Sequence, residues 1–413
     1  MIETPTSQRL HIGIFGNTNC GKSSFLNGIT GQNHALVSNI AGTTTDLVFK
    51  PMEIHGIGPV VFIDTAGFED TSELGEERIK KTFLATEKTD VALILFNAEE
   101  VINKNFNEKN FLESQIAKLI EKLKQEKKSF IPIINKIDLI DTEEKQFQLK
   151  TFTNFIEKFT KEKPIQISAK EKIGMEQIKQ ELLRKVPEDF QKLTLTQNLC
   201  KEDDIVLLVM PQDIQAPKGR LILPQVQIIR ELLDKKCSVI SCTTDKFVHT
   251  LRLLKNPPTL IITDSQVFKF VYENKPSESK LTSFSVLLAA NKGDINQFVE
   301  GAKQISKLTE KSKILIAEAC THAPLTEDIG TVKIPNMLKK FVGSEISITH
   351  VNGNDFPKDL SQFDLIIHCG ACMFNRSYVL SRQSQAELSK IPMTNYGIAI
   401  AYMTGIMDKI QIP

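Results

Sequence analysis

The chain has 413 residues, and its 51 basic and 50 acidic side chains give a formal net charge of +1. A hydrophobic fraction of 41% and a charged fraction of 24% are ordinary for a globular protein, so disorder, collagen and coiled coil are excluded as whole-chain descriptions. The near-zero charge gives no general attraction to nucleic acid or to anionic membranes.

The number of cysteines and the hydropathy of the chain indicate the cellular compartment of the protein. No apolar run reaches the roughly 18 residues that a membrane-spanning helix needs, and the first residues lack a basic segment followed by an apolar one. Seven cysteines are few and odd in number, unlike the disulfide framework of a secreted protein. We therefore expect a cytoplasmic protein with no membrane or nucleic-acid partner, and the length favours two or three domains.

Residues 1–188 form the first predicted domain, in which short β-rich runs alternate with helical patterns. Such alternation indicates βαβ units and a largely parallel sheet. The charges of Lys104–Lys128, mixed in sign at helical spacing, predict a solvated helix face. The predicted strands are His11–Phe15, Val48–Ile54, Val60–Asp64, Val91–Asn97, Phe130–Lys136 and Pro164–Ser168, and the long predicted helices include Phe111–Glu126 and Met175–Lys185.

A phosphate-binding loop is predicted between the first strand and the helix that follows it. The segment Gly16-Asn17-Thr-Asn19-Cys-Gly21-Lys22-Ser23 matches Gly-x-x-x-x-Gly-Lys-Ser/Thr. Its glycines allow backbone N–H groups to surround phosphates, Lys22 would reach the β- and γ-phosphates, and the Ser23 hydroxyl would hold Mg²⁺. The helix that starts at Ser24 presents its positive end to the same charge.

Further nucleotide-binding segments follow in the expected order, each at the carboxyl end of a strand, where open α/β sheets bind ligands. In Asp64-Thr-Ala-Gly67, Asp64 can touch the magnesium shell and Gly67 can meet the γ-phosphate. In Asn135-Lys136-Ile-Asp138, the Asp138 carboxylate can accept both N1–H and the 2-amino group of guanine, which selects GTP because adenine offers neither donor.

The last of these segments, Ser168-Ala169-Lys170, could close over the base. The complete set resembles GTPases of the translation-factor-related class. We therefore predict a GTP and Mg²⁺ site whose catalytic residues are Lys22, Ser23, Asp64 and Gly67.

The segment Gly42-Thr43-Thr44-Thr45-Asp46 resembles the first switch of potassium-activated GTPases related to tRNA-modifying proteins, with Thr45 as the candidate for Mg²⁺. In those enzymes an asparagine that matches Asn19 coordinates K⁺, whereas the alternative for Asn19 is a turn former. Phe68 stands where Ras-like enzymes have a water-positioning glutamine, and an apolar side chain cannot orient water. We expect slow hydrolysis, stimulated by K⁺ or by pairing of two GTPase domains.

Two smaller domains are predicted to follow, residues 189–274 and residues 275–413, so the fold class is α/β, a P-loop GTPase domain followed by two smaller parallel α/β domains. The first of them is small enough to be marginal alone, which makes oligomerisation through it plausible. Its predicted strands are Ile205–Met210, Ser238–Cys242 and Thr259–Thr263, with helices at Pro224–Lys235 and Lys246–Lys255. The last domain has predicted strands Ser285–Ala290, Lys313–Ala317, Ile346–His350 and Asp364–Ile367.

Cysteines and histidines gather after two strands of the last domain. Cys320-Thr-His322 follows one strand and His368-Cys369-Gly-Ala-Cys372 follows another, so the two clusters can converge at one sheet edge. Cys369 and Cys372 alone fit a redox pair or buried small residues equally well, but the added residues favour a metal site. Three cysteines and one histidine would satisfy zinc, whereas an iron–sulfur cluster normally takes four thiolates, so the donor set slightly favours zinc.

A GTPase domain followed by Cys-x-His, a spacer and His-Cys-x-x-Cys resembles the FeFe-hydrogenase maturation GTPases (HydF) over essentially the whole chain. The resemblance implies that Cys320, Cys369 and Cys372 ligate a 4Fe–4S cluster, with His322 and His368 close to it. It also implies an exchangeable ligand at the fourth iron. Our candidate is Glu327, for which the alternative is an ordinary loop or helix-start carboxylate.

The resemblance further implies a scaffold and carrier, a dimer or larger, that receives a two-iron unit made with two radical-SAM maturases and delivers it to apo FeFe-hydrogenase. GTP would regulate partner exchange through switch segments. Two alternatives stay open from the residues themselves. One is a tRNA-modification or ribosome-assembly GTPase with a structural zinc module, and the other is a GTP-dependent redox enzyme that uses Cys369 and Cys372 as a dithiol.

Overall fold

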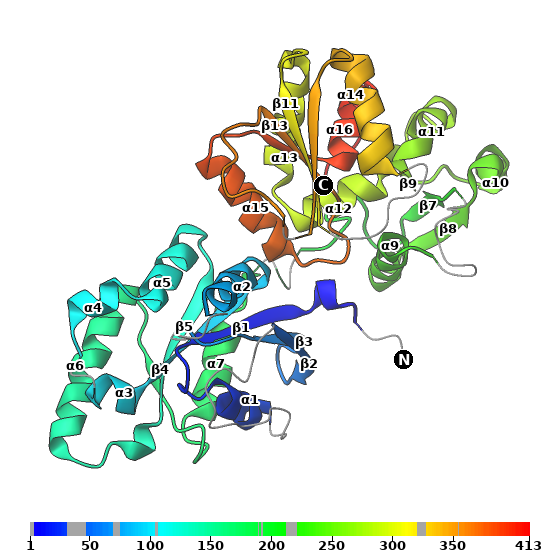
Figure 1. Ribbon diagram of the computed structural model, residues 1–413. Helices are drawn as coiled ribbons and strands as arrows, with labels where there is room; N and C mark the ends of the chain where they lie inside the picture. Colours follow the sequence, from blue (N-terminus) through cyan, green and yellow to red (C-terminus); the bar gives the residue numbers. More distant parts are fainter. Residues whose placement is uncertain are drawn as a thin grey trace. The chain divides into compact units, whose positions relative to one another are not determined.

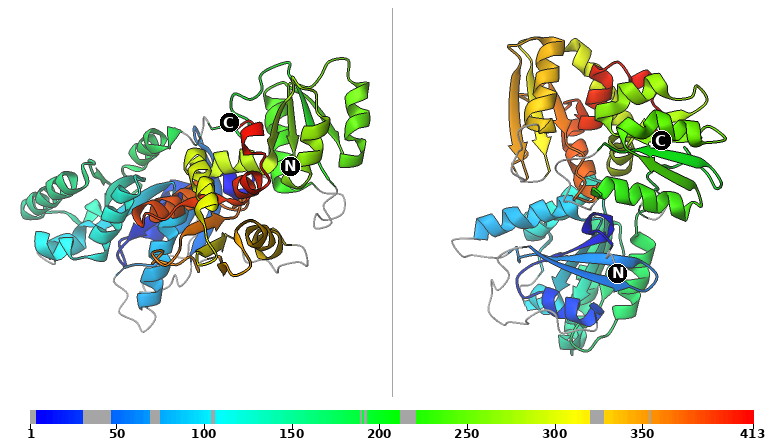
Figure 2. Two further views of the ribbon diagram at one scale, coloured as in Figure 1. Left: turned by 90° about the horizontal axis from the view of Figure 1, so that it is seen from above. Right: turned by 90° about the vertical axis from the view of Figure 1, so that its right-hand side faces the viewer.

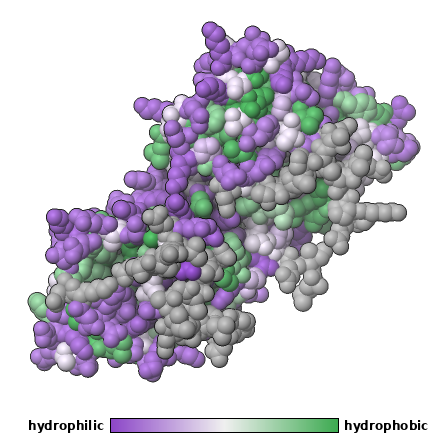
Figure 3. All heavy atoms as spheres, in the orientation of Figure 1, coloured by the Kyte–Doolittle hydropathy of each residue, from purple (hydrophilic) through white to green (hydrophobic). Residues whose placement is uncertain are grey.

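The computed structural model describes residues 4–30, 47–68, 75–103, 106–188, 190, 193–211, 221–319, 328–353 and 355–413. The chain forms two compact units, Met1–Gln191 and Lys192–Pro413 (Figure 1). Across the described ranges, every helix is too short or too polar to cross a membrane. On the face drawn in Figure 3, hydrophilic residues predominate and hydrophobic ones form separate groups.

The first unit is built on a six-stranded sheet of order β2-β3-β1-β4-β5-β6, in which β2 alone is antiparallel to its neighbour. Its strands are β1 (Leu10–Gly16), β2 (Val48–Ile54), β3 (Gly58–Asp64), β4 (Val91–Asn97), β5 (Ser129–Asn135) and β6 (Ile165–Gln166). Its helices are α1 (Lys22–Thr30), α2 (Gly75–Lys88), α3 (Ala98–Asn103), α4 (Glu108–Leu112), α5 (Gln115–Gln125), α6 (Glu143–Thr160) and α7 (Met175–Lys185).

Helices cover both faces of this sheet, which explains why β1 is buried along its whole length and reads as a continuous apolar run (Figures 1 and 2). Ile12 and Ile14 contribute to a core shared with α1 and α7. Phe15 contributes to the opposite core, shared with α2, α5 and α6. The carboxyl ends of the central strands, where the predicted motifs lie, are therefore fixed from both sides.

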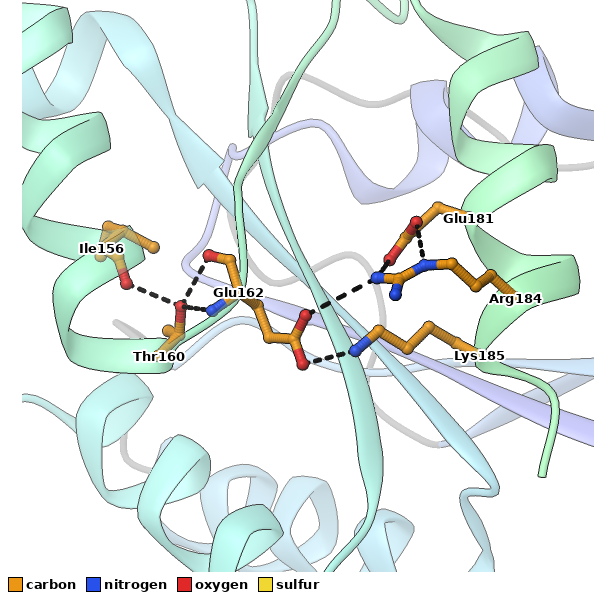
Figure 4. Close-up of polar contacts among 6 residues, drawn as sticks. All are labelled: Ile156, Thr160, Glu162, Glu181, Arg184 and Lys185. Carbon is orange, nitrogen blue, oxygen red and sulfur yellow. Dashed lines mark hydrogen bonds and ion pairs between the residues drawn. The ribbon is translucent and has the colours of Figure 1, made fainter. Parts of the chain in front are cut away.

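A polar network joins the chain that leaves α6 to the end of α7 (Figure 4). Glu162 forms ion pairs with Lys185 and, at 4.0 Å, with Arg184, and Arg184 also donates to Glu181 at 2.9 Å. The Thr160 hydroxyl donates to the carbonyl oxygen of Ile156 at 2.6 Å, which closes the last turn of α6. Because β6 and the predicted base-binding loop lie between these helices in sequence, the network holds both ends of that segment.

The second unit contains two four-stranded sheets that are parallel throughout, of order β10-β9-β7-β8 and β12-β11-β13-β14. The strands are β7 (Ile205–Val209), β8 (Ser238–Cys242), β9 (Leu260–Thr263), β10 (Lys280–Ser283), β11 (Lys313–Glu318), β12 (Ser347–Asn352), β13 (Leu365–His368) and β14 (Met393–Asn395). The helices are α9 (Leu223–Asp234), α10 (Phe247–Leu253), α11 (Phe268–Asn274), α12 (Phe284–Lys292), α13 (Ile295–Lys303), α14 (Ile334–Val342), α15 (Arg376–Leu388) and α16 (Tyr396–Met403).

The two sheets of the second unit share one hydrophobic core. Leu207 and Ile261 from the first sheet belong to the same buried cluster as Ile314 and Ile366 from the second. This shared core compensates for the small size of the first of the two predicted domains, residues 189–274, which we had expected to be marginal on its own. The fourth strand of the first sheet, β10, lies beyond residue 274, so that sheet extends past the predicted boundary, and the three-domain division stays a prediction.

The structure confirms all the predicted strands to within two residues except one. Residues Ser285–Ala290 belong to α12, so the strand prediction was wrong there. A short, wholly buried apolar run fits a helix as well as a strand, and the Ser283 hydroxyl accepts the N–H of Val286 and starts a helix instead.

The single helix predicted for Phe111–Glu126 was also wrong, because α4 ends at Leu112 and Ser114 caps a second helix, α5, at the N–H of Ala117. In α5 the charged side chains of Lys118 and Glu121 are exposed as predicted, while its apolar face packs on the sheet.

Candidate functional site

The predicted phosphate-binding loop connects β1 to α1. Gly16 and Gly21 have φ values of 156° and 91°, and Asn19 between them has 62°, so the loop depends on left-handed conformations. The Lys22 ammonium donates to the carbonyl oxygens of Gly16 at 3.0 Å and Asn17 at 2.9 Å, which directs it over the loop. Asn19 is exposed at the tip of the loop. The loop backbone and the Lys22 ammonium therefore surround the position where an anion is bound in such loops.

Asp64 and Gly67 lie beside this loop, as the sequence predicted. Asp64 ends β3 and is 4% exposed, and burial raises the pKa of its carboxyl group, opposed by the positive charges of Lys22 and Lys50. A Cβ on Gly67 would come within 2.6 Å of the Cα of Thr18, so only glycine permits this contact. The segment after β3 is thus held directly against the phosphate loop.

Phe68 is 4% exposed and packs against the ring of Phe83 in α2, with centroids 5.7 Å apart. The side chain is therefore committed to the hydrophobic core and cannot orient a water molecule. This confirms that no hydrogen-bonding group stands at that position.

The base-binding motifs are joined to the phosphate loop by Asn135. Its amide is 1% exposed, donates to the carbonyl oxygen of Cys20 at 2.9 Å and accepts the N–H of Ala169 at 3.0 Å. The Ser168 hydroxyl donates to Asp138 at 2.5 Å, which orients the carboxylate. Lys136, between Asn135 and Asp138, has a φ of 66° and turns the chain there. Three predicted motifs therefore meet, and the bridging role of Asn135 was not predicted.

The predicted cysteine site lies at the carboxyl ends of β11 and β13. The Cys369 sulfur accepts the N–H groups of Ala319 at 3.1 Å and Ala371 at 3.4 Å, and Ala371 has a φ of 46°. Ala319 immediately precedes Cys320, so the end of β11 lies beside the Cys369–Cys372 loop. The predicted convergence of the two strand ends is present.

His368 ends β13 and is completely buried. Its Nδ1 is 2.7 Å from the carbonyl oxygen of Cys369, and its Nε2 is 3.0 Å from the guanidinium of Arg382. Burial, with the charge of Arg382, lowers the pKa of His368 to about 3. Because an arginine can only donate, Nε2 accepts and Nδ1 carries the proton. Both ring nitrogens are therefore engaged by the protein, and His368 lies near the site without being free to ligate.

Sequence reasoning missed several residues around this loop. Arg382 comes from α15, and Asn395, at the end of β14, donates to the Cys369 carbonyl oxygen at 3.2 Å. Glu318 accepts the hydroxyl of Tyr396 at 3.1 Å, and burial followed by the charges of Glu318 and Cys369 raises the Tyr396 pKa. None of these residues forms a motif with the cysteines, so no sequence signal could have identified them.

Several predicted residues lie outside the described residues, namely Thr43, Thr44, Thr45, Cys320, His322 and Glu327. Within the described ranges, no group of three or more metal-ligating side chains gathers. Asp328, which follows Glu327, caps the turn after it by accepting the N–H groups of Gly330 and Thr331.

Family models match three consecutive parts of the chain. Residues 11–136 match a 50S ribosome-binding GTPase domain. Residues 195–293 match the hydrogen maturase F dimerization domain, and residues 296–412 match the hydrogen maturase F tetramerization domain. The last two models together span more than half of the chain. The chain belongs to the hydrogen maturase F family.

Two curated relatives of this hydrogen maturase F protein are GTPases. The tRNA modification GTPase MnmE of Flavobacterium johnsoniae is 36% identical over 175 residues, which cover 42% of this chain and 34% of that protein. GTPase Der of Kosmotoga olearia is 34% identical over 148 residues, covering 35% of this chain and 31% of that protein. The chain thus spans about a third of the length of these relatives.

A solved structure of Era from Aquifex aeolicus bound to GDP·AlF4⁻ covers 59% of this chain and 98% of its own, with 18% identity and a TM-score of 0.36. The family model matched by residues 11–136 shows that the first unit of this hydrogen maturase F protein is a P-loop GTPase domain, as predicted. The region with Cys369 and Cys372 falls within the family's tetramerization domain, a role that was not predicted.

Proposed function

We propose that this protein is a GTP-hydrolysing maturation factor for FeFe-hydrogenase that binds a 4Fe–4S cluster and carries a two-iron unit to the apo-enzyme. Cys320, Cys369 and Cys372 hold the cluster, and Glu327 is the candidate for the exchangeable fourth ligand. The observation that carries the proposal is the position of Cys369. Its sulfur accepts two backbone N–H groups, one of them from Ala319, the residue before Cys320.

The residues present fit such a cluster. N–H donors to a cysteine sulfur stabilise the thiolate that ligates iron, and they are among the features that set cluster potentials. The engagement of both His368 nitrogens opposes a Cys₃His zinc site that uses this histidine. When bound, the cluster supplies an iron position with an exchangeable ligand. The matches to dimerization and tetramerization domains support an oligomer, whose partners are apo-hydrogenase and two radical-SAM maturases.

In the GTPase unit we propose that Lys22, Ser23, Asp64 and Gly67 act on GTP and Mg²⁺, and that Asn19 binds K⁺. The burial of Phe68 supports slow intrinsic turnover. Hydrolysis would then act as a timer that releases the switch segments and so regulates partner exchange.

Anaerobic reconstitution with iron and sulfide tests the cluster. We expect a broad brown absorption and an EPR signal on reduction in the wild type, both lost in Cys369→Ala, with GTP turnover unchanged. Cys242→Ala is the matched control, because Cys242 lies at the end of β8 outside the loop, and it should load iron like the wild type. Stoichiometric zinc without iron in anaerobically purified protein would overturn the proposal.

A further inference from the structure

A positive charge is buried beneath the cysteine loop. Arg382 is 1% exposed and ranks among the largest fully buried side chains. Its guanidinium donates to His368 Nε2 at 3.0 Å, to the carbonyl oxygen of Gly353 at 2.5 Å and to the Tyr378 hydroxyl. All three acceptors are neutral. Within the described residues, Nε has no acceptor and no carboxylate pairs with the guanidinium.

Burial of such a charge is costly. A buried ion loses its favourable hydration, and an opposite charge normally compensates for this loss. The guanidinium carbon lies 4.3 Å from the centroid of the Tyr378 ring and 4.6 Å from that of Phe356, so cation–π attraction offsets part of the cost. The remaining cost indicates that a negative charge belongs nearby in the functional protein.

A continuous hydrogen-bonded path leads from this charge to the loop. Arg382 donates to His368 Nε2, His368 Nδ1–H donates to the Cys369 carbonyl oxygen, and Asn395 donates to the same oxygen. The Cys369 carbonyl oxygen is thus held by His368, whose other ring nitrogen is held by Arg382, and independently by Asn395. Thiolates and a reduced cluster carry negative charge. A bound cluster would therefore supply the counter-charge that the guanidinium lacks among the described residues.

We propose that Arg382 is a positioning residue that sets the reduction potential of the cluster, by supplying a fixed positive charge beneath it and by locking His368 as the neutral Nδ1–H tautomer that anchors Cys369. This inference rests on the proposed function. Reduction adds one negative charge to the cluster, and a buried cation favours the more negative state because screening is weak in the protein interior. Arg382 therefore raises the reduction potential of the cluster. Charges and hydrogen bonds around a metal site commonly tune this potential.

The test compares Arg382→Met with Arg382→Lys in reconstituted full-length protein, using EPR-monitored redox titration. The two replacements are similar in length and differ in charge. We expect Arg382→Met to decrease the equilibrium constant for cluster reduction about tenfold, which for one electron lowers the midpoint potential by about 59 mV. Arg382→Lys should stay close to the wild type. Lys340→Gln, which removes an exposed positive charge on α14, should leave the potential unchanged.

Three results would overturn the inference, and they are distinguishable. If the wild type binds no cluster, the proposed function fails and this inference fails with it. If Arg382→Met binds the cluster with a wild-type potential, this inference alone fails. If Arg382→Met does not fold, NMR of isotopically labelled histidine in the wild-type apo-protein tests the proposed tautomer of His368 directly. The Nδ1–H tautomer of His368 is expected, because Arg382 can only donate to Nε2, and an Nε2–H tautomer would contradict the lock.

Discussion

In the GTPase unit, the residues predicted to meet the nucleotide belong to short motifs at strand ends, and these motifs contact one another directly through Asn135 and Gly67. In the second unit, the cysteine loop is supported by residues that belong to no motif, of which Arg382 and Asn395 are the nearest. The difference teaches that a binding site for a common ligand can be recognised from contiguous residues. The surroundings of a site for a rarer ligand are instead distributed over the fold. If the two regions are as independent as this comparison suggests, a substitution in one region should leave the other unaffected.

The largest effect is expected for Lys22→Ala. The Lys22 ammonium lies over the phosphate loop, and loss of one preorganised electrostatic group typically lowers kcat by about 10²–10³-fold. GTP turnover under saturating nucleotide measures this, with Lys150→Ala on the exposed face of α6 as control. Iron content after reconstitution should not change. A parallel loss of iron would show that the cysteine site depends on the GTPase unit.

The same contrast between the two regions explains which parts of the fold and of the candidate sites could be predicted from the sequence. The strand ends and motifs of the first unit could be predicted because parallel strands buried on both faces read as apolar runs that end in the functional residues. Ser285–Ala290 could not be assigned correctly, because its apolar run has no periodicity that separates a helix from a strand. The convergence of Cys369 with the residue before Cys320 was predicted from topology. The buried Arg382 was not, because an arginine on a polar-looking helix is ordinarily exposed.

A smaller effect is expected for Asn135→Ala. The substitution leaves the Cys20 carbonyl oxygen and the Ala169 N–H buried without a partner, and each such group costs about 1–3 kcal/mol. We expect the unfolding free energy of the first unit to fall by about 2–4 kcal/mol and GTP affinity to fall with it, because phosphate and base segments are no longer joined. Chemical denaturation and nucleotide titration measure the two effects.

Asn154→Ala, an exposed change on α6, is the control for Asn135→Ala. If GTP affinity falls while stability is unchanged, Asn135 touches the nucleotide instead of joining the motifs. Loss of the cluster in Asn135→Ala would contradict the independence of the two regions.

The smallest effect concerns Asn19 and K⁺. Asn19 is exposed at the tip of the phosphate loop with a φ of 62°, a conformation that asparagine and glycine both tolerate. Asn19→Gly therefore preserves the backbone and removes only the side-chain oxygen, whereas Asn19→Ala would also add strain. If Asn19 ligates K⁺, wild-type turnover should be severalfold faster in K⁺ than in Na⁺, and Asn19→Gly should lose that difference while retaining its Na⁺ rate. If Asn19 is only a turn former, Asn19→Gly keeps the wild-type ratio, and the resemblance to potassium-activated GTPases then extends to the loop's shape without its ion.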